Sequence, residues 1–159
     1  MKQKKNRKTV VITSGYFDPL HIGHIECFRK ARKLGDELMV IVNTDHQARL
    51  KKDYSFMPQQ ERKKIIESLK FVDKALLSID KDMTQCETLK SISLLNNKSD
   101  KNKLIFAKGG DRFAGEIPEA NICKKYGIKI VDGLGKKIQS SSELVKKMKS
   151  RKSGASYLW

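Results

Sequence analysis

Residues 9–24 read TVVITSGYFDPLHIGH, and this stretch predicts the fold. Its first part, 9–13, is a β-branched run that is typical of a buried strand. Gly15 frees the backbone directly after that strand, and Pro19 restricts the approach to the next segment. From residue 25 onward apolar side chains recur every three residues, which indicates a helix. The stretch therefore predicts a strand, a turn and a helix in immediate succession.

The rest of the chain repeats this alternation. We expect further strands at 38–42, 72–79, 104–107 and 128–131, a polar loop at 46–56, and helices at 58–69, 84–95, 118–126 and 140–149. Strands that alternate with helices predict an α/β, Rossmann-like fold, with a parallel five-stranded sheet and helices on both faces. We expect a single domain over 9–149, with a basic flexible tail at 1–8 and a C-terminal tail at 150–159.

Composition narrows the class of protein. The 159 residues, 38% hydrophobic and 33% charged, fit one globular domain. No apolar run reaches the ~20 residues that a membrane span needs, and the basic N-terminus lacks the apolar core of a signal peptide. The three cysteines are widely scattered. We therefore expect a reduced, cytoplasmic chain without a disulfide framework, without a cysteine metal site and without a membrane partner.

The net charge is +16, and most of the basic residues are lysines spread along the chain. Such a charge can attract nucleic acid, or it can surround a site for a small anionic ligand. The sequence has neither zinc-finger spacing nor an aromatic-rich strand pattern that would stack RNA bases. A nucleic-acid partner is therefore not expected.

Four polar segments follow predicted strands: GYFDPLHIGH at 15–24, NTDHQARLKK at 43–52, KGGDR at 108–112 and GKKIQSSS at 135–142. Ligands of parallel sheets bind beyond the carboxyl ends of the strands. We therefore expect these segments to meet at one site.

Two histidines, His21 and His24, lie one turn apart near the start of the first predicted helix. A helix N-terminus offers free N–H groups and the positive end of the helix dipole to an anion, and Gly23 lets a ligand approach the backbone there. Neutral imidazole can donate to phosphate oxygens, and imidazolium can stabilise developing negative charge. The pattern predicts a site for a polyphosphate whose bond is being broken.

The stretch GYFDPLHIGH resembles the signature of the cytidylyltransferase-like nucleotidyltransferases, which belong to the same superfamily as class I aminoacyl-tRNA synthetases. The resemblance covers about residues 8–148. It implies that ATP or CTP reacts with a phosphorylated small molecule to give a nucleotide-diphospho product and pyrophosphate. It implies Mg²⁺ carried by the nucleotide phosphates, with no protein ligand that we can name. Members of this family are commonly dimers, so it also implies a homodimer.

The resemblance implies residue roles as well. His21 and His24 are catalytic, together with Lys51 or Lys52, between which the sequence does not choose. The implied acceptor-binding residues are Asp45 and Arg62. The implied nucleotide-binding residues are Tyr16, Phe17, Asp18, Gly23, Lys108, Gly109, Asp111, Gln139, Ser140, Ser141 and Ser142.

Two motifs bear on the substrates. The segment 135–142 lacks the arginine of the R-T-E-G-I-S-T-T motif that is typical of cytidylyl members, which argues against selectivity for CTP. KGGD at 108–111 resembles the heptose-1-phosphate adenylyltransferases, which favours ATP and a sugar-phosphate or polyol-phosphate acceptor. The alternatives are a non-catalytic nucleotide- or nucleic-acid-binding protein of the same fold, and a fragment of a tRNA synthetase, which the absence of a K-M-S-K-S motif argues against.

Overall fold

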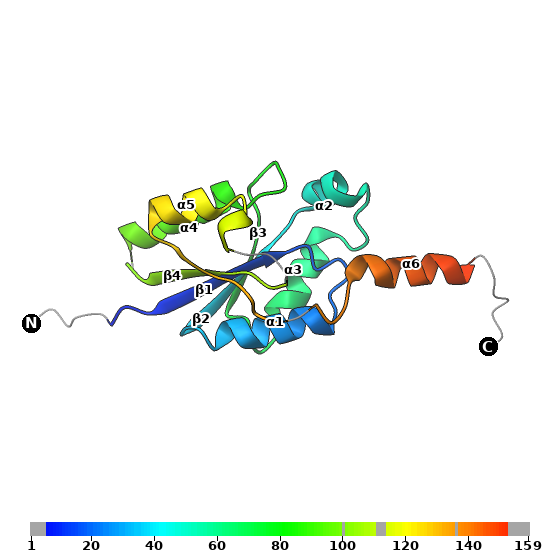
Figure 1. Ribbon diagram of the computed structural model, residues 1–159, viewed down its shortest axis with the longest axis horizontal. Helices are drawn as coiled ribbons and strands as arrows, with labels where there is room; N and C mark the ends of the chain where they lie inside the picture. Colours follow the sequence, from blue (N-terminus) through cyan, green and yellow to red (C-terminus); the bar gives the residue numbers. More distant parts are fainter. Residues whose placement is uncertain (1–5, 100, 111–113, 136, 153–159) are drawn as a thin grey trace, which may run out of the picture.

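The structure is a computed structural model that describes residues 6–99, 101–110, 114–135 and 137–152 (Figure 1). Its five strands form one parallel sheet in the order β3-β2-β1-β4-β5. The strands are β1 (Thr9–Gly15), β2 (Glu37–Val42), β3 (Lys74–Leu77), β4 (Lys103–Ala107) and β5 (Lys129–Val131). The predicted sheet is confirmed. Because β1 is the central strand, the turn that follows it lies at the middle of the carboxyl edge.

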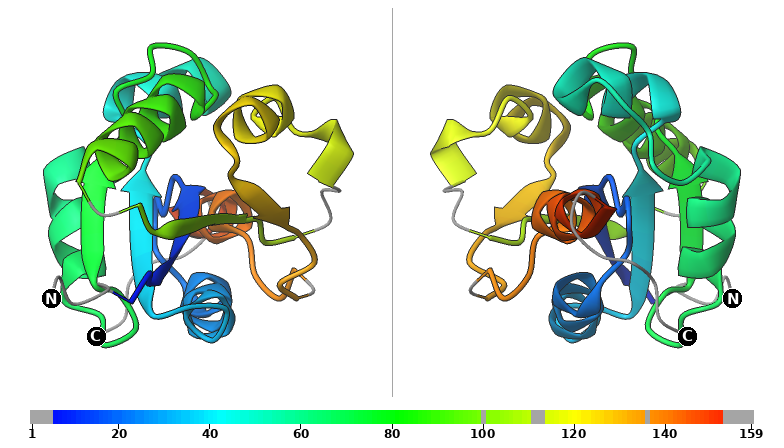
Figure 2. Two further views of the ribbon diagram at one scale, coloured as in Figure 1. Left: turned by 90° about the vertical axis from the view of Figure 1, so that its left-hand side faces the viewer. Right: turned by 90° about the vertical axis from the view of Figure 1, so that its right-hand side faces the viewer.

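Helices cover both faces of the sheet, as predicted (Figure 2). The helical segments are α1 (Ile22–Arg32), α2 (Asp45–Lys52), α3 (Gln59–Glu67), α4 (Cys86–Lys98), η1 (Ala114–Glu116), α5 (Ala120–Tyr126) and α6 (Ser141–Lys152). Helices α1 and α3 pack on one face, and α4 and α5 on the other. None of the helices in the described part of the chain has the length and apolar character that a membrane crossing requires.

Alternate side chains of the central strands supply the two cores. Val11 and Val40 face Phe28 of α1, whereas Ile12 and Ile41 belong to the cluster on the opposite face. All five side chains are nearly or completely buried. Burial on both faces explains why the strands are continuous apolar runs rather than alternating ones.

Helix α2 occupies a segment for which the sequence predicts a polar loop. That prediction is wrong because Thr44 and Gln47 form a capping box: the Gln47 N–H donates to Thr44 Oγ1 at 3.2 Å, and the Thr44 N–H donates to Gln47 Oε1 at 3.0 Å. Gln47 and Ala48 are also completely buried. The helix ends at Asp53, whose φ of 63° is left-handed. The T-x-x-Q spacing at 44–47 is the sequence signal for this helix.

Helix α6 begins at the carboxyl edge of the sheet and extends beyond it (Figure 1). The Ser141 hydroxyl donates to the carbonyl oxygen of Pro19 at 2.8 Å, which fastens the start of α6 to the turn after β1. Val145 is buried, whereas most of the helix is exposed. The last helix therefore brings its first residues, rather than its full length, to the edge where ligands bind.

Candidate active site

The turn after β1 folds Phe17 back over the end of the strand. Phe17 has a left-handed φ of 52° and is buried. A Cβ added to Gly15 would lie 2.8 Å from Phe17 Cζ, so only glycine leaves room for the ring. The ring meets His24 edge-on, with 4.9 Å between ring centroids, and Phe28 at 5.2 Å. Phe17 is thus a support for the first turn of α1.

His21 and His24 cap the N-terminus of α1 with their own rings. The Gly23 N–H donates to His21 Nδ1 at 3.1 Å, and the His21 N–H donates to His24 Nδ1 at 3.2 Å. The two rings stack with 3.7 Å between centroids. Because each ring accepts a hydrogen bond at Nδ1, the proton of the neutral imidazole lies on Nε2. Each histidine therefore has an Nε2–H group that can donate to a ligand at a helix N-terminus.

Both histidines are held in the neutral form. Burial, assisted by the neighbouring His21, lowers the pKa of His24 to about 3. Burial also lowers the pKa of His21. Of the two chemical roles that the sequence leaves open for these residues, donation by neutral imidazole is the one that this environment favours.

The segment before α6 lies beside the histidines. A Cβ added to Gly23 would lie 3.0 Å from His21 Cε1 and 3.4 Å from Ile138 Cγ1. The Ser140 hydroxyl accepts from the Glu143 N–H at 3.5 Å, while the Ser140 N–H donates to Gln139 Oε1 at 3.0 Å. Residues 138–142 therefore form a second helix N-terminus next to the first.

Lys108 and Gly109 bring the end of β4 to the same edge. Lys108 Nζ lies 3.5 Å from Ser14 Oγ and 3.9 Å from Glu119 Oε2. A Cβ added to Gly109 would lie 2.9 Å from Cys27 Sγ, so the backbone after β4 packs closely against α1. Asp111, also predicted to bind nucleotide, lies outside the described residues.

Asp18 holds the loop that follows α2. Its carboxylate is completely buried, and it accepts from the Phe56 N–H at 2.9 Å and from the Met57 N–H at 2.6 Å. Lys52 Nζ lies 3.0 Å from Asp18 Oδ2 and donates to the Asp18 carbonyl oxygen at 2.9 Å. These contacts favour a positioning role for Asp18 over a direct contact with the nucleotide.

Arg62 is buried in the same network, with 1% of its surface exposed. Its guanidinium donates to three carbonyl oxygens, those of Tyr16 at 2.6 Å, Asn43 at 2.7 Å and Met57 at 2.8 Å. It also donates to Asp45 Oδ1 at 2.7 Å. This geometry favours a positioning role for Arg62 over the acceptor contact that the resemblance implies.

Asp45 is ionised in this arrangement. Burial acts to raise the pKa of Asp45, but hydrogen bonds from the Ser55 hydroxyl and Arg62 outweigh it and hold that pKa below its usual range. Asp45 is therefore the negative partner of Arg62, and its side chain is 24% exposed.

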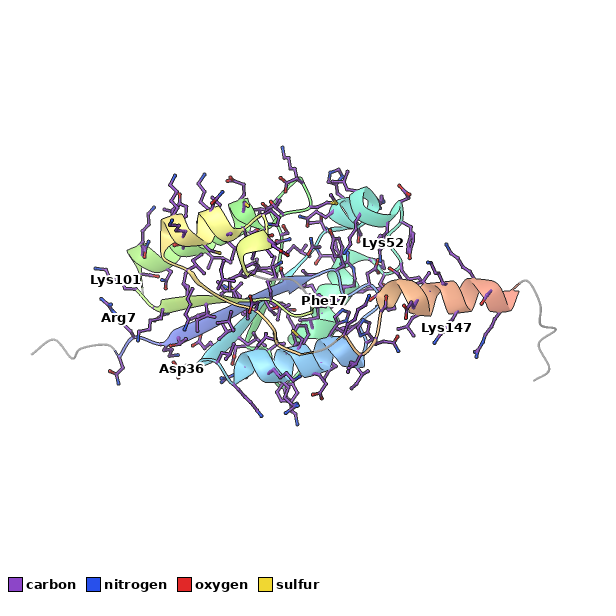
Figure 3. All side chains as sticks on the ribbon, viewed as in Figure 1. Arg7, Phe17, Asp36, Lys52, Lys101 and Lys147 are labelled. Atoms are coloured by element: carbon purple, nitrogen blue, oxygen red, sulfur yellow. The ribbon has the colours of Figure 1, made fainter. Side chains whose placement is uncertain are left out.

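The two lysines that the sequence does not distinguish lie in different surroundings. Lys52 is 14% exposed and its ammonium is bound to Asp18. Lys51 is exposed, and its Nζ lies 4.4 Å from the centroid of the Tyr16 ring. Phe17 and Lys52 lie at the end of the sheet where α6 begins (Figure 3).

Sequence reasoning missed several residues at this edge. Ser14 precedes the histidine motif, Cys27 follows it, and Glu119 contacts Lys108 from a distant segment. Position directly after or beside a quoted motif is the only signal available for Ser14 and Cys27. Glu119 is brought in by the packing of α5, which no local pattern encodes, whereas Ile138 belongs to the predicted segment 135–142.

A protein-family model described as "Cytidylyltransferase-like" matches residues 12–147, which are most of the chain. The chain belongs to the cytidylyltransferase-like family. The matched range contains all the loops described above at the carboxyl edge of the sheet, so the predicted family and fold are both confirmed.

Relatives of this cytidylyltransferase-like chain have different names. It is 43% identical over 72 residues to the FAD synthase of Archaeoglobus fulgidus, covering 45% of this chain and 52% of that protein. It is 34% identical over 148 residues to the bifunctional protein HldE of Nitratiruptor sp., covering 92% of this chain but 29% of that protein. The matches thus span about half of the first relative and less than a third of the second.

A solved structure supports the same assignment. The chain resembles a lipopolysaccharide core biosynthesis protein from Thermoplasma volcanium, with a TM-score of 0.59 and 31% sequence identity, over 79% of this chain and 95% of that one. In this cytidylyltransferase-like fold the described donors at the carboxyl edge are imidazole N–H groups, lysine ammonium groups and helix N-termini. Such donors suit a polyphosphate.

Proposed function

We propose that this chain is a nucleotidyltransferase that joins the nucleoside monophosphate of ATP or CTP to a phosphorylated small molecule, a sugar phosphate or a polyol phosphate, and releases pyrophosphate. The observation that carries the proposal is the pair of neutral histidines at the N-terminus of α1. Their Nδ1 atoms are used by the backbone, so their Nε2–H groups are available to phosphate oxygens. Membership of the cytidylyltransferase-like family supports the reaction class.

The reaction is an in-line displacement at the α-phosphorus. An oxygen of the acceptor phosphate forms a bond to that phosphorus, and the bond from the phosphorus to the bridging oxygen breaks. The electron pair of the broken bond leaves with pyrophosphate. The attacking oxygen is already anionic, so no general base is needed, and catalysis consists of positioning and stabilisation of charge.

His21 and His24 donate to the triphosphate at the helix N-terminus, where the dipole of α1 favours negative charge. The N-terminus of α6, with Ser140 and Ser142, lies beside them and suits the terminal phosphates. Lys108 reaches the same edge from β4, and Lys51 from α2. Asp18 and Arg62 hold the turn and the loop that carry these groups.

The described residues of this site suit phosphate oxygens better than a metal ion. Among the described residues no three histidine, cysteine, aspartate or glutamate side chains cluster as metal ligands. The donors that are present fit phosphate oxygens rather than a cation. Mg²⁺ would therefore be held by the phosphates and by water, as is usual for this ion, and it would neutralise phosphate charge.

Support for a hydroxyl-rich acceptor comes from two buried side-chain oxygens near Lys108. Gln85 Oε1 and Glu119 Oε2 are buried, and neither accepts a hydrogen bond from the part of the chain that the structure describes. The two residues are adjacent, since the Gln85 N–H donates to Glu119 Oε1 at 3.0 Å. An unsatisfied buried acceptor costs about 1–3 kcal/mol, which hydroxyl donors of an acceptor substrate would recover where binding opens this region to the substrate.

The relatives named FAD synthase favour ATP, whereas a relative named glycerol-3-phosphate cytidylyltransferase keeps CTP among the candidates. FAD is the adenylyl adduct of FMN, and FMN carries its phosphate on a polyol chain. The A. fulgidus relative is named FAD synthase. We therefore include FMN among the polyol phosphates that the chain could accept.

The test is release of pyrophosphate by the purified chain with Mg²⁺ and either ATP or CTP, in the presence of glycerol 3-phosphate, a sugar 1-phosphate or FMN. We expect release that requires both a nucleotide and one of the acceptors. A thermal shift caused by ATP or CTP, with no pyrophosphate from any pair, would instead identify a nucleotide-binding protein that does not catalyse transfer.

A further inference from the structure

A groove of about 530 Å³ opens at the amino end of the sheet. Thr9, Lys103 and Lys129, the first residues of β1, β4 and β5, lie in its wall. The candidate active site follows the other ends of these parallel strands. Because β1 has seven residues, the two ends of the sheet are about 20 Å apart. Arg7 and Lys101, which also line the groove, lie at the opposite end of the molecule from Lys147 of α6 (Figure 3).

The lining of the groove is rich in positive charge. Four cations line it, those of Arg7, Lys101, Lys103 and Lys129, and none of its described lining residues is acidic. The ion pairs found within the described part of the chain include none of these four. Asp100 lies outside the described residues. Four cations that have no ion-pair partner among the described residues favour an anionic ligand.

Helix ends account for only part of this cluster of cations. Lysines often lie near helix C-termini because they offset the negative end of the dipole. Here two of the last carbonyl groups have backbone partners: the Lys101 N–H donates to the Asn96 carbonyl oxygen at 2.8 Å, and the Ile128 N–H donates to that of Cys123 at 2.9 Å. Arg7 comes from the segment before β1 rather than from a helix.

The size and lining of the groove indicate a small ligand. Sites for small molecules have volumes of about 300–1,000 Å³. Beside the cations, Asn97 supplies an amide that can donate and accept, and Tyr126 supplies an aromatic ring. An amide and a ring suit the organic part of a phosphorylated ligand, whereas the cations suit its phosphates.

We propose that this groove is a second binding site, for a ligand of nucleotide size that carries two or more phosphate groups. Arg7, Lys101, Lys103 and Lys129 bind the phosphates, and Asn97 and Tyr126 contact the remainder. The site is separate from the candidate active site, and it does not depend on the proposed transferase activity.

The test is a titration of the purified chain followed by amide NMR. The probes are inorganic tripolyphosphate, ADP and a single-stranded RNA oligonucleotide. The Gly127 and Lys103 amides report on the groove, and the Gly23 amide reports on the active site. The variant carries Lys101→Glu and Lys103→Glu, and the matched control carries Lys64→Glu and Lys147→Glu, which change the net charge equally at exposed positions elsewhere.

We expect tripolyphosphate and ADP to shift the groove amides to saturation in the wild type and the control. The groove variant should bind at least about tenfold more weakly at those amides while keeping its response at Gly23. Shifts confined to Gly23, or equal weakening in variant and control, would overturn the proposal. Saturation of the groove amides by RNA alone, with a steep salt dependence, would also overturn it and assign the groove to nucleic acid.

Discussion

The histidine pair and the Asp18–Arg62 network lie at the same edge of the sheet. The histidines offer a donor to a ligand, whereas Asp18 and Arg62 use their polar atoms to bind other parts of the protein. The histidines use Nδ1 to cap α1, which leaves Nε2–H for a ligand. Arg62 donates to three carbonyl oxygens and a carboxylate of the protein, and Asp18 accepts from two backbone N–H groups. Charged residues at a ligand-binding edge can therefore act by contact or by positioning, and burial distinguishes the two.

The largest effect on stability is expected at Arg62. Arg62→Met keeps most of the side-chain volume but leaves Asp45 and three buried carbonyl oxygens without their donor, while Asp18 keeps Lys52. The free energy of unfolding should therefore fall by about 3–5 kcal/mol. Urea denaturation measures the change. Lys63→Met is the matched control, since Lys63 pairs with Glu67 at the surface and should cost less than ~1 kcal/mol. Unchanged stability combined with a raised KM for the acceptor would show that Arg62 binds the acceptor after all.

A smaller effect should separate Lys51 from Lys52. Lys51→Ala should lower kcat and kcat/KM together, by about tenfold, because Lys51 is exposed beside the turn and can meet the transferring phosphate. Lys52→Ala should instead lower the free energy of unfolding by about 1–3 kcal/mol, because it removes a buried partner of Asp18. Steady-state kinetics and urea denaturation on both variants measure the two effects. The reverse assignment would make Lys52 the residue in contact with substrate.

A further effect concerns pH. The pKa of His24 is about 3 in the folded chain and 6.5 when unperturbed, so between these values the unfolded chain binds more protons. The stability of the fold should therefore fall as pH drops below 6.5 toward 3, and the contribution should be complete above 6.5. His24→Gln does not titrate, and glutamine can keep the hydrogen bond to the His21 N–H. Thermal unfolding between pH 7 and pH 5 should show a weaker acid dependence in this variant, and an identical dependence would contradict the assigned pKa.

Local patterns in the sequence predicted the sheet, the helices on both faces and the histidine turn. The strands are apolar on both faces, and the G-x-F-D-x-x-H-x-G-H motif needs its glycines for the close approach of Phe17 and His21. Such features depend on neighbouring residues alone. The assignment of the chain to its family followed from the same motif.

Tertiary packing determines features that local patterns in the sequence do not predict fully, among them the burial of Arg62. The burial of Arg62 depends on Tyr16, Asn43 and Met57, which come from three separate segments, so no spacing within its own helix indicates it. The polar segment at 46–52 has a local helix signal in the T-x-x-Q capping box at 44–47, and it is further fixed as a helix by the burial of Gln47 and Ala48 against the rest of the fold. Periodicity of apolar residues alone does not detect a helix whose buried face includes glutamine.

The central claim is that neutral His24 donates to the triphosphate as charge develops, and the turnover of His24→Ala tests it most directly. Pyrophosphate release should be measured for the wild type, His24→Ala and His24→Gln, with thermal unfolding of each to confirm the fold. Loss of a donor of this kind typically lowers kcat by about 10²–10³, and we expect that loss in His24→Ala while the chain remains folded at the assay temperature. A kcat within about threefold of the wild type would contradict the account.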